Sequence, residues 1–188
     1  MGRDVLLIRR FDRVIGGQRR HVVSGLTMLG MDALLGARYG SYPEMLDVLR
    51  EWARDPQDVG GQLFERVVFN VAIGNNDDHA RNHAAFWDGV GLELTPAFDL
   101  TPQPRSTDTS AQAMAIGRDG SRASRFSVCV DAAADYGLSR PEARQTVERI
   151  VSTIRDRWID TADAAGLSEA DRNLLWNRAI LNASCFYD

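Results

Sequence analysis

The sequence predicts a single, mainly α-helical domain with small β elements. Helical patterns dominate its second half, and the longest covers residues 140–165, where apolar residues recur at helical spacing. Short apolar runs beside turn residues predict a few strands, including a hairpin over 84–95. A length of 188 residues, with no repeat and no linker-like stretch, suits one hydrophobic core.

The first 36 residues predict a β-hairpin and a short helix. Residues 4–13 begin as a compact apolar run, which predicts a buried strand. Gly16 and Gly17 are a turn signal, and residues 19–24 predict the returning strand. A helix is expected over 26–35, because Gly36 follows its last apolar residue.

Two further helices are expected before residue 74. Ser41, Pro43 and Glu44 are typical of a helix start, with a serine cap and a glutamate three residues later. This helix stops at Asp55-Pro56, and a second, buried helix runs from Gly60 to Ile73. The apolar face of the first helix consists of Met45, Leu46, Leu49 and Trp52.

The region after residue 83 is expected to be β-hairpin and then loop. Residues 84–87 and 92–95 predict two strands joined by a turn. Residues 101–108 hold two prolines and several hydroxyls, which predicts a loop. Residues 111–116 suit a short strand or an extended segment.

Three helices are predicted in the C-terminal part, over 125–136, 140–165 and 168–183. The third begins with Ser168 and two acids in its first turn, which suits the positive end of a helix. The second carries an apolar stripe at helical spacing, which we expect to pack in the core. The stripe consists of Val147, Ile150, Val151, Ile154 and Trp158.

The composition is that of an ordinary water-soluble protein, with 44% hydrophobic and 26% charged residues. No apolar run approaches the ~20 residues of a membrane helix, and no signal peptide is recognisable. We therefore expect a cytoplasmic protein without membrane contact. A net charge of −4 gives no general attraction to nucleic acid, and we expect no direct contact with it. Cys129 and Cys185 have no metal-binding spacing and are expected to be inert core residues.

The chain contains no lysine, since all 22 basic residues are arginine. Mechanisms that need a lysine phosphate contact or a lysine Schiff base are thus excluded within this chain. It also contains neither of the glycine-rich phosphate-binding motifs.

Polar side chains are most concentrated in residues 74–83, G-N-N-D-D-H-A-R-N-H, directly after the predicted helix 60–73. Polar groups this dense beside a core element need solvent or a ligand. The predicted hairpin separates them from a second segment, residues 96–100, in which Asp99 lies between apolar neighbours. We expect the two segments to face each other across one site.

Asp77 and Asn82 have the spacing D-x-x-x-x-N that protein kinases use in their catalytic loop. There the aspartate accepts or orients the proton of the substrate hydroxyl, and the asparagine binds Mg²⁺. Mg²⁺ prefers oxygen ligands, and Asp99 suits the role of a second metal ligand. His79 would donate a hydrogen bond to a phosphate or to the loop backbone.

Other interpretations of the same residues remain open at this point. Asp77 or Asp78 would cap a helix that begins near His79. His79 and His83, with Asp77 or Asp99, would form a zinc or iron site of two histidines and a carboxylate. A packed or surface position is the simpler explanation for His83. Salt bridges are the simpler explanation for Arg10 and Arg13.

Three segments together resemble the HipA-like serine/threonine kinases of bacterial toxin–antitoxin modules: 8–13 (I-R-R-F-D-R), 74–82 and 96–100. The resemblance implies ATP and Mg²⁺ as cofactors, with Asp77 as catalytic residue. It implies Mg²⁺ ligands at Asn82 and Asp99. The ATP phosphates and metal would lie against His79, Ala80, Arg81, Asn82, Phe98 and Asp99. The family hinge, whose backbone meets adenine, matches Arg9, Arg10 and Phe11. The family more often has glutamate where this chain has Arg9.

The resemblance covers only the C-terminal lobe of such kinases. The N-terminal lobe, with its phosphate loop, its ATP-binding lysine and a regulatory serine, is expected to be missing. We expect hinge and hairpin over 1–24, helices over 25–73, catalytic and metal-binding segments over 74–100, and loop and helical subdomain over 101–188. The chain alone is expected to have little kinase activity. Expected partners are a protein substrate with serine or threonine and either an antitoxin or a separate N-lobe chain. The alternative is a non-catalytic, pseudokinase-like module that binds an antitoxin.

Overall fold

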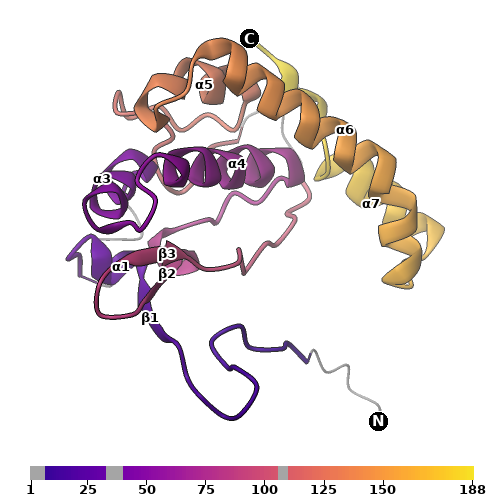
Figure 1. Ribbon diagram of the computed structural model, residues 1–188. Helices are drawn as coiled ribbons and strands as arrows, with labels where there is room; N and C mark the ends of the chain where they lie inside the picture. Colours follow the sequence, from indigo (N-terminus) through magenta and orange to yellow (C-terminus); the bar gives the residue numbers. More distant parts are fainter. Residues whose placement is uncertain (1–6, 33–39, 106–109) are drawn as a thin grey trace.

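Helix α4 (Asp58–Ile73) runs through the middle of the protein in the computed structural model (Figure 1). A three-stranded sheet and helix α1 (Gly25–Met28) lie on one side, and helices α5 (Phe126–Asp131) and α6 (Arg140–Ala164) lie on the other. The structure describes residues 7–32, 40–105 and 110–188. No helix within these ranges is long and apolar enough to cross a membrane. The predicted class, mainly α with a small sheet, is confirmed.

Helix α3 (Tyr42–Trp52) begins as the sequence predicts. The Ser41 side chain accepts a hydrogen bond from the Glu44 amide, and the Glu44 carboxylate accepts one from the Ser41 amide. This reciprocal cap satisfies two backbone donors that a helix start would otherwise leave unpaired. Three residues of the predicted apolar face are buried, whereas Trp52 is half exposed.

The sheet has the order β1-β2-β3, and all pairs are antiparallel. Strand β1 (His21–Ser24) pairs with β2 (Ala84–Trp87), which pairs with β3 (Leu92–Leu94). The β2–β3 hairpin confirms the prediction for 84–95.

The predicted N-terminal hairpin forms only next to its turn, and the first part of its first strand is not formed. Residues 4–6 lie outside the described ranges, and Leu7 and Ile8 are 89% and 76% exposed in irregular backbone. Around the Gly16-Gly17 turn the expected pairing is present: Arg13 and Arg19 form an antiparallel bridge, and the Arg20 amide donates to the Asp12 carbonyl at 2.9 Å. The rest of the predicted returning strand is β1, which pairs with β2, where three of the four residues are buried, whereas residues 7–10 are exposed.

The C-terminal part is helical, with breaks at two unpredicted places. Its elements are α5 (Phe126–Asp131), η2 (Ala133–Tyr136), α6 (Arg140–Ala164), α7 (Glu169–Arg178) and η3 (Ala183–Phe186). The predicted helix 125–136 is interrupted at Ala132, and the predicted helix 168–183 ends five residues early. The expected helix over 26–35 is α1, which ends at Met28; residues 33–35 lie outside the described ranges. Residues 111–116 form no regular strand, since bends interrupt them and only isolated bridges occur, at Ala111 and Ala115.

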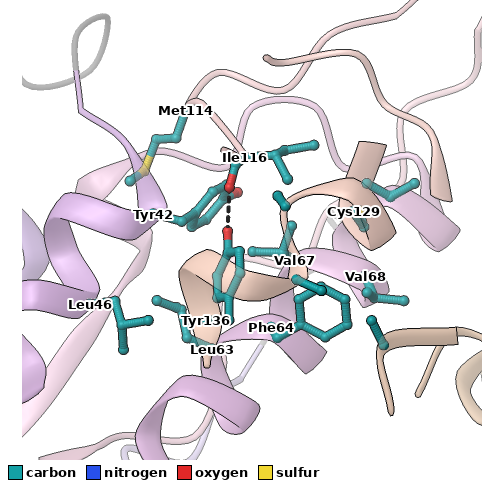
Figure 2. Packing of buried hydrophobic residues seen from close by; sticks show 14 of the residues in the cluster. Tyr42, Leu46, Leu63, Phe64, Val67, Val68, Met114, Ile116, Cys129 and Tyr136 are labelled. Atoms are coloured by element: carbon teal, nitrogen blue, oxygen red, sulfur yellow. Dashed lines mark hydrogen bonds between the residues drawn. The ribbon is translucent and has the colours of Figure 1, made fainter. Parts of the chain in front are cut away.

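The hydrophobic core gathers around α4 (Figure 2). Phe64 of α4 packs edge-on against Tyr136, with ring centroids 5.3 Å apart, and the Tyr136 hydroxyl donates to the Ile116 carbonyl at 2.7 Å. Cys129 and Cys185 are free and buried, as predicted. Burial raises the pKa of Cys129 to about 12, so its thiol stays protonated and inert at neutral pH.

Candidate active site

The segment with Asp77 begins where α4 is forced to end. Gly74 adopts a left-handed conformation (φ 71°), and its amide donates to the Asn70 and Val71 carbonyls. This ending is typical of a glycine cap. A Cβ at Gly74 would also lie 3.0 Å from the Ala179 carbonyl oxygen. The chain therefore leaves the helix at one defined point and enters the irregular backbone of 75–79.

Asp77 is the exposed residue in a loop whose other polar side chains are mostly turned inward. Asn75 and Asp78 are buried, and Asn76 is half-buried. The Asn75 side chain donates to the Asn70 side chain at 3.0 Å, within the end of α4. The side chains beside Asp77 thus hold the loop, while its own carboxylate faces solvent.

Asn82 lies at the end of the 3₁₀ helix η1 (Ala80–Asn82) and folds back on Asp77. Its amide nitrogen donates to the Asp77 carbonyl at 3.3 Å, which orients the side chain. The nitrogen is therefore engaged with the backbone, and the amide oxygen is left as an acceptor for a cation. The side-chain oxygen of an asparagine is a suitable ligand for Mg²⁺.

Asp99 follows β3 after a short irregular stretch. Its backbone has φ 57°, a left-handed conformation that costs about 1 kcal/mol or more for a residue with a side chain. The Asn75 side chain donates to the Asp99 carbonyl at 3.4 Å. One asparagine thus joins the loop of Asp77 to the segment of Asp99, while the Asp99 side chain is exposed.

Of the three candidate hinge residues, Phe11 contacts a predicted site residue, whereas Arg9 and Arg10 point to solvent or to Asp12. Phe11 lies between Phe86 and Phe98, with ring centroids 5.8 Å from each. Arg9 and Arg10 are exposed, and Arg10 forms a two-point contact with Asp12 at 2.7 Å. The interpretation of Arg10 as a salt-bridging residue is confirmed, and Arg13 also lies 3.8 Å from Asp12.

The remaining predicted residues, His79, Ala80 and Arg81, lie at the start of η1 and within it. His79 is half-buried at its start, and its Nδ1 is enclosed without a hydrogen-bond partner among the described residues. Ala80 is buried against Gly25 of α1, where a Cβ on the glycine would approach the Ala80 carbonyl to 2.5 Å. Arg81 is exposed.

Asp78 has a role that sequence reasoning missed. Its Oδ2 accepts hydrogen bonds from Tyr42 at 2.6 Å, from Asn70 at 2.7 Å and from His83 at 2.7 Å. The capping interpretation is therefore wrong for Asp78. No side-chain cap is made at the start of η1, and no α-helix begins near His79.

The zinc or iron interpretation is not supported. His83 is buried against Asp78 and the Tyr42 ring, and its Nε2 is engaged with the Asp78 carboxylate. Across ranges 7–32, 40–105 and 110–188, no three His, Cys, Asp or Glu side chains are grouped to hold a metal ion. A site for Mg²⁺ would rest on Asn82 and Asp99 and fill its remaining positions with water and phosphate oxygens.

Arg105 is a second unpredicted residue beside the loop. Its guanidinium donates to Ser184 at 3.1 Å, to Ser124 at 2.9 Å and to Asn76 at 3.5 Å. Gln112 also donates to the Asn76 side chain, at 3.4 Å. Asn76 is thus held from the C-terminal part of the domain, just before Asp77. These partners are far apart in sequence, and no local pattern signals them.

Comparison with solved structures defines the class of this fold. A chain in the solved complex of HipA and HipB with operator DNA from Shewanella oneidensis MR-1 has a TM-score of 0.68 to this structure. The match covers 89% of this chain and 44% of that chain, at 23% identity. The fold is therefore that of part of a chain in this HipA–HipB complex.

The sequence itself is matched by the family of HipA-like C-terminal domains over residues 1–158. The chain belongs to that family, which confirms the resemblance. It is 25% identical to the Y4mE protein of Sinorhizobium fredii, which carries a provisional kinase name, over 86% of this chain and 43% of that protein. It is 29% identical to the serine/threonine-protein kinase toxin HipA of Shewanella oneidensis, over 59% of this chain and 30% of that protein. The chain thus spans less than half the length of these relatives.

Proposed function

We propose that this chain is the catalytic C-terminal lobe of an ATP-dependent serine/threonine kinase of a toxin–antitoxin system. The observation that carries the proposal is the setting of Asp77. Its carboxylate is exposed in a loop held by buried neighbours, Asn82 is bonded to its carbonyl, and Asn75 joins the same loop to Asp99. The relative named as a serine/threonine kinase toxin supports this class of reaction.

In the proposed mechanism, Asp77 accepts the proton of a substrate serine or threonine hydroxyl. The hydroxyl oxygen then forms a bond to the γ-phosphorus of ATP, and the bond between that phosphorus and the β–γ bridging oxygen breaks to release ADP. Asn82 and Asp99 would hold Mg²⁺, which supplies neutralisation of the phosphate charge. Residues 79–82 and Phe98 would line the phosphates, and the backbone of 9–11 would meet adenine.

These site residues agree with the division of the chain that we propose from the sequence, in which residues 74–100 contain the catalytic and metal-binding segments. The lobe that covers the nucleotide would be supplied from outside these 188 residues, by a longer chain or by a partner. The structural relative comes from a complex with HipB, which supports an antitoxin-type protein as a further partner of this chain. The same complex contains operator DNA, so the absence of direct contact with nucleic acid stays a prediction.

The test is a kinase assay on the native assembly that contains this chain, with radiolabelled ATP, Mg²⁺ and a protein substrate. Removal of a general base lowers turnover about 10²- to 10⁴-fold, so Asp77→Asn is expected to fall in that range with its circular dichroism spectrum unchanged. Asp131→Asn is the control, because Asp131 is exposed and forms a surface ion pair with Arg140. The isolated chain is expected to show almost no turnover.

Unchanged turnover in Asp77→Asn would remove Asp77 from the mechanism. An inactive native assembly that still retains a bound partner would favour the pseudokinase-like binding module.

A further inference from the structure

Asp78 is a buried carboxylate on which three segments of the protein converge. Its side chain is 2% exposed, and that of His83 is 3% exposed. The donors come from the first residue of α3 (Tyr42), the last turn of α4 (Asn70) and the residue before β2 (His83). All three bind the same oxygen, Oδ2, at 2.6–2.7 Å.

The three donors replace water around this carboxylate. A buried carboxylate is tolerated only where hydrogen bonds compensate for its lost hydration. Carboxylate oxygens only accept, which assigns the Nε2–H tautomer to His83. Burial and the adjacent charge of Asp78 hold the pKa of Tyr42 well above its usual range, so the phenol remains a donor.

This anchor is adjacent to Asp77 in the chain, and the two carboxylates have opposite environments. Asp78 is drawn into the core, whereas Asp77 is exposed. We propose that Asp78 is a positioning residue, which through Tyr42, Asn70 and His83 holds the loop so that Asp77 remains exposed beside Asn82. The inference rests on the proposed function, because that function gives Asp77 its catalytic role. The hydrogen bonds that hold the loop can, however, be tested without a kinase assay.

The chain offers a matched pair of variants. Tyr42 and Tyr136 are both fully buried in the same core, and each hydroxyl donates one hydrogen bond, to Asp78 and to the Ile116 carbonyl respectively (Figure 2 shows both rings). Tyr42→Phe and Tyr136→Phe therefore remove the same group at nearly the same burial. Only the first weakens the Asp78 anchor.

Two readouts on the full chain test the proposal: amide hydrogen exchange of residues 75–83, and Mn²⁺ affinity by electron paramagnetic resonance as a probe of the Asn82 and Asp99 site. Loss of a hydrogen bond to a charged group changes the equilibrium constant for local opening of the loop by roughly tenfold or more. Tyr42→Phe is expected to speed exchange in the loop by that factor and to weaken Mn²⁺ binding, with exchange in α6 unchanged. Tyr136→Phe is expected to change neither loop exchange nor Mn²⁺ affinity.

Rescue gives a second test. Asp78→Ala removes all three bonds, whereas Asp78→Asn keeps one acceptor oxygen and is expected to restore part of the Mn²⁺ affinity. If Asp78→Ala does not fold, the tyrosine pair still decides the question. Equal loop exchange in the two tyrosine variants would overturn the anchor. Faster exchange with unaltered Mn²⁺ affinity would overturn the positioning role. Failure of the wild-type chain to bind Mn²⁺ would instead refute the proposed metal site, and loop exchange would then decide on the anchor alone.

Discussion

Two adjacent glycines near the start of α4 are expected to respond in opposite directions to the same substitution. A Cβ on Gly60 would lie 2.2 Å from the Tyr136 carbonyl oxygen, a distance that real Cβ atoms do not reach. A Cβ on Gly61 would meet nothing within 4 Å. Gly60→Ala thus forces the backbones of α4 and η2 apart, whereas Gly61→Ala only replaces a poor helix former.

The magnitudes follow from these contacts. Alanine is favoured over glycine in a helix by up to about 1 kcal/mol, and Gly61→Ala is expected to gain part of that. The same gain at Gly60 is outweighed by overpacking, which typically costs about 1–3 kcal/mol. For a domain of this size 1 kcal/mol shifts Tm by about 2–4 °C. We therefore expect Tm to rise slightly for Gly61→Ala and to fall by several degrees for Gly60→Ala.

The assay is thermal and urea unfolding followed by circular dichroism, with both variants measured beside the wild type. A Gly60→Ala variant as stable as Gly61→Ala would refute the close approach of α4 and η2. Because α4 carries Asn70 and is followed directly by Gly74, a displaced α4 is also expected to disturb the loop of Asp77. Faster hydrogen exchange over 75–83 in Gly60→Ala alone would show this.

Two further predictions concern pH and helix capping. The folded state raises the pKa of Cys129 to about 12, whereas the thiol of the unfolded chain has a pKa of about 8.5. The stability from this group is therefore full below about pH 8.5 and falls by about 1.4 kcal/mol per pH unit from there to about pH 12. Urea unfolding at pH 8 and pH 10 is expected to show this loss and a smaller loss in Cys129→Ala; equal losses would contradict it. Removing the serine of either capping box, in Ser41→Ala or Ser139→Ala, is expected to cost about 1 kcal/mol and so lower Tm by about 2–4 °C. An unchanged Tm in both variants would contradict the capping geometry.

The elements that the sequence predicts correctly are those specified by neighbouring residues. The start of α3 depends on Ser41 and Glu44, three residues apart, and the β2–β3 hairpin depends on a turn of a few residues. The N-terminal strand fails for the opposite reason. An apolar run such as 5–8 contains no information on whether another element covers it, and Leu7 and Ile8 are exposed.

The candidate site shows the same limit. The spacing of Asp77 and Asn82 is a local signal and is visible in the sequence. Asp77 and Asp78 are, however, the same residue type side by side, and no local pattern distinguishes the exposed carboxylate from the buried one. The difference arises from the three donors that bind Asp78, and one of them, Tyr42, lies 36 residues before Asp78 and reaches it only when α3 has packed.

The contacts of Arg105 have a consequence for biosynthesis. Arg105 lies between Asn76, which directly precedes Asp77, and Ser184, which follows Arg105 by 79 residues. During translation the loop of Asp77 leaves the ribosome well before Ser184 is made. At about 5–20 residues per second, several seconds of synthesis separate the two. In the nascent chain, the loop that carries Asp77 therefore lacks the contact from Arg105 to Ser184 until helices α6 and α7 have been translated and have packed against the domain. For a kinase of the proposed class, that delay would keep the site immature until Ser184 has been translated.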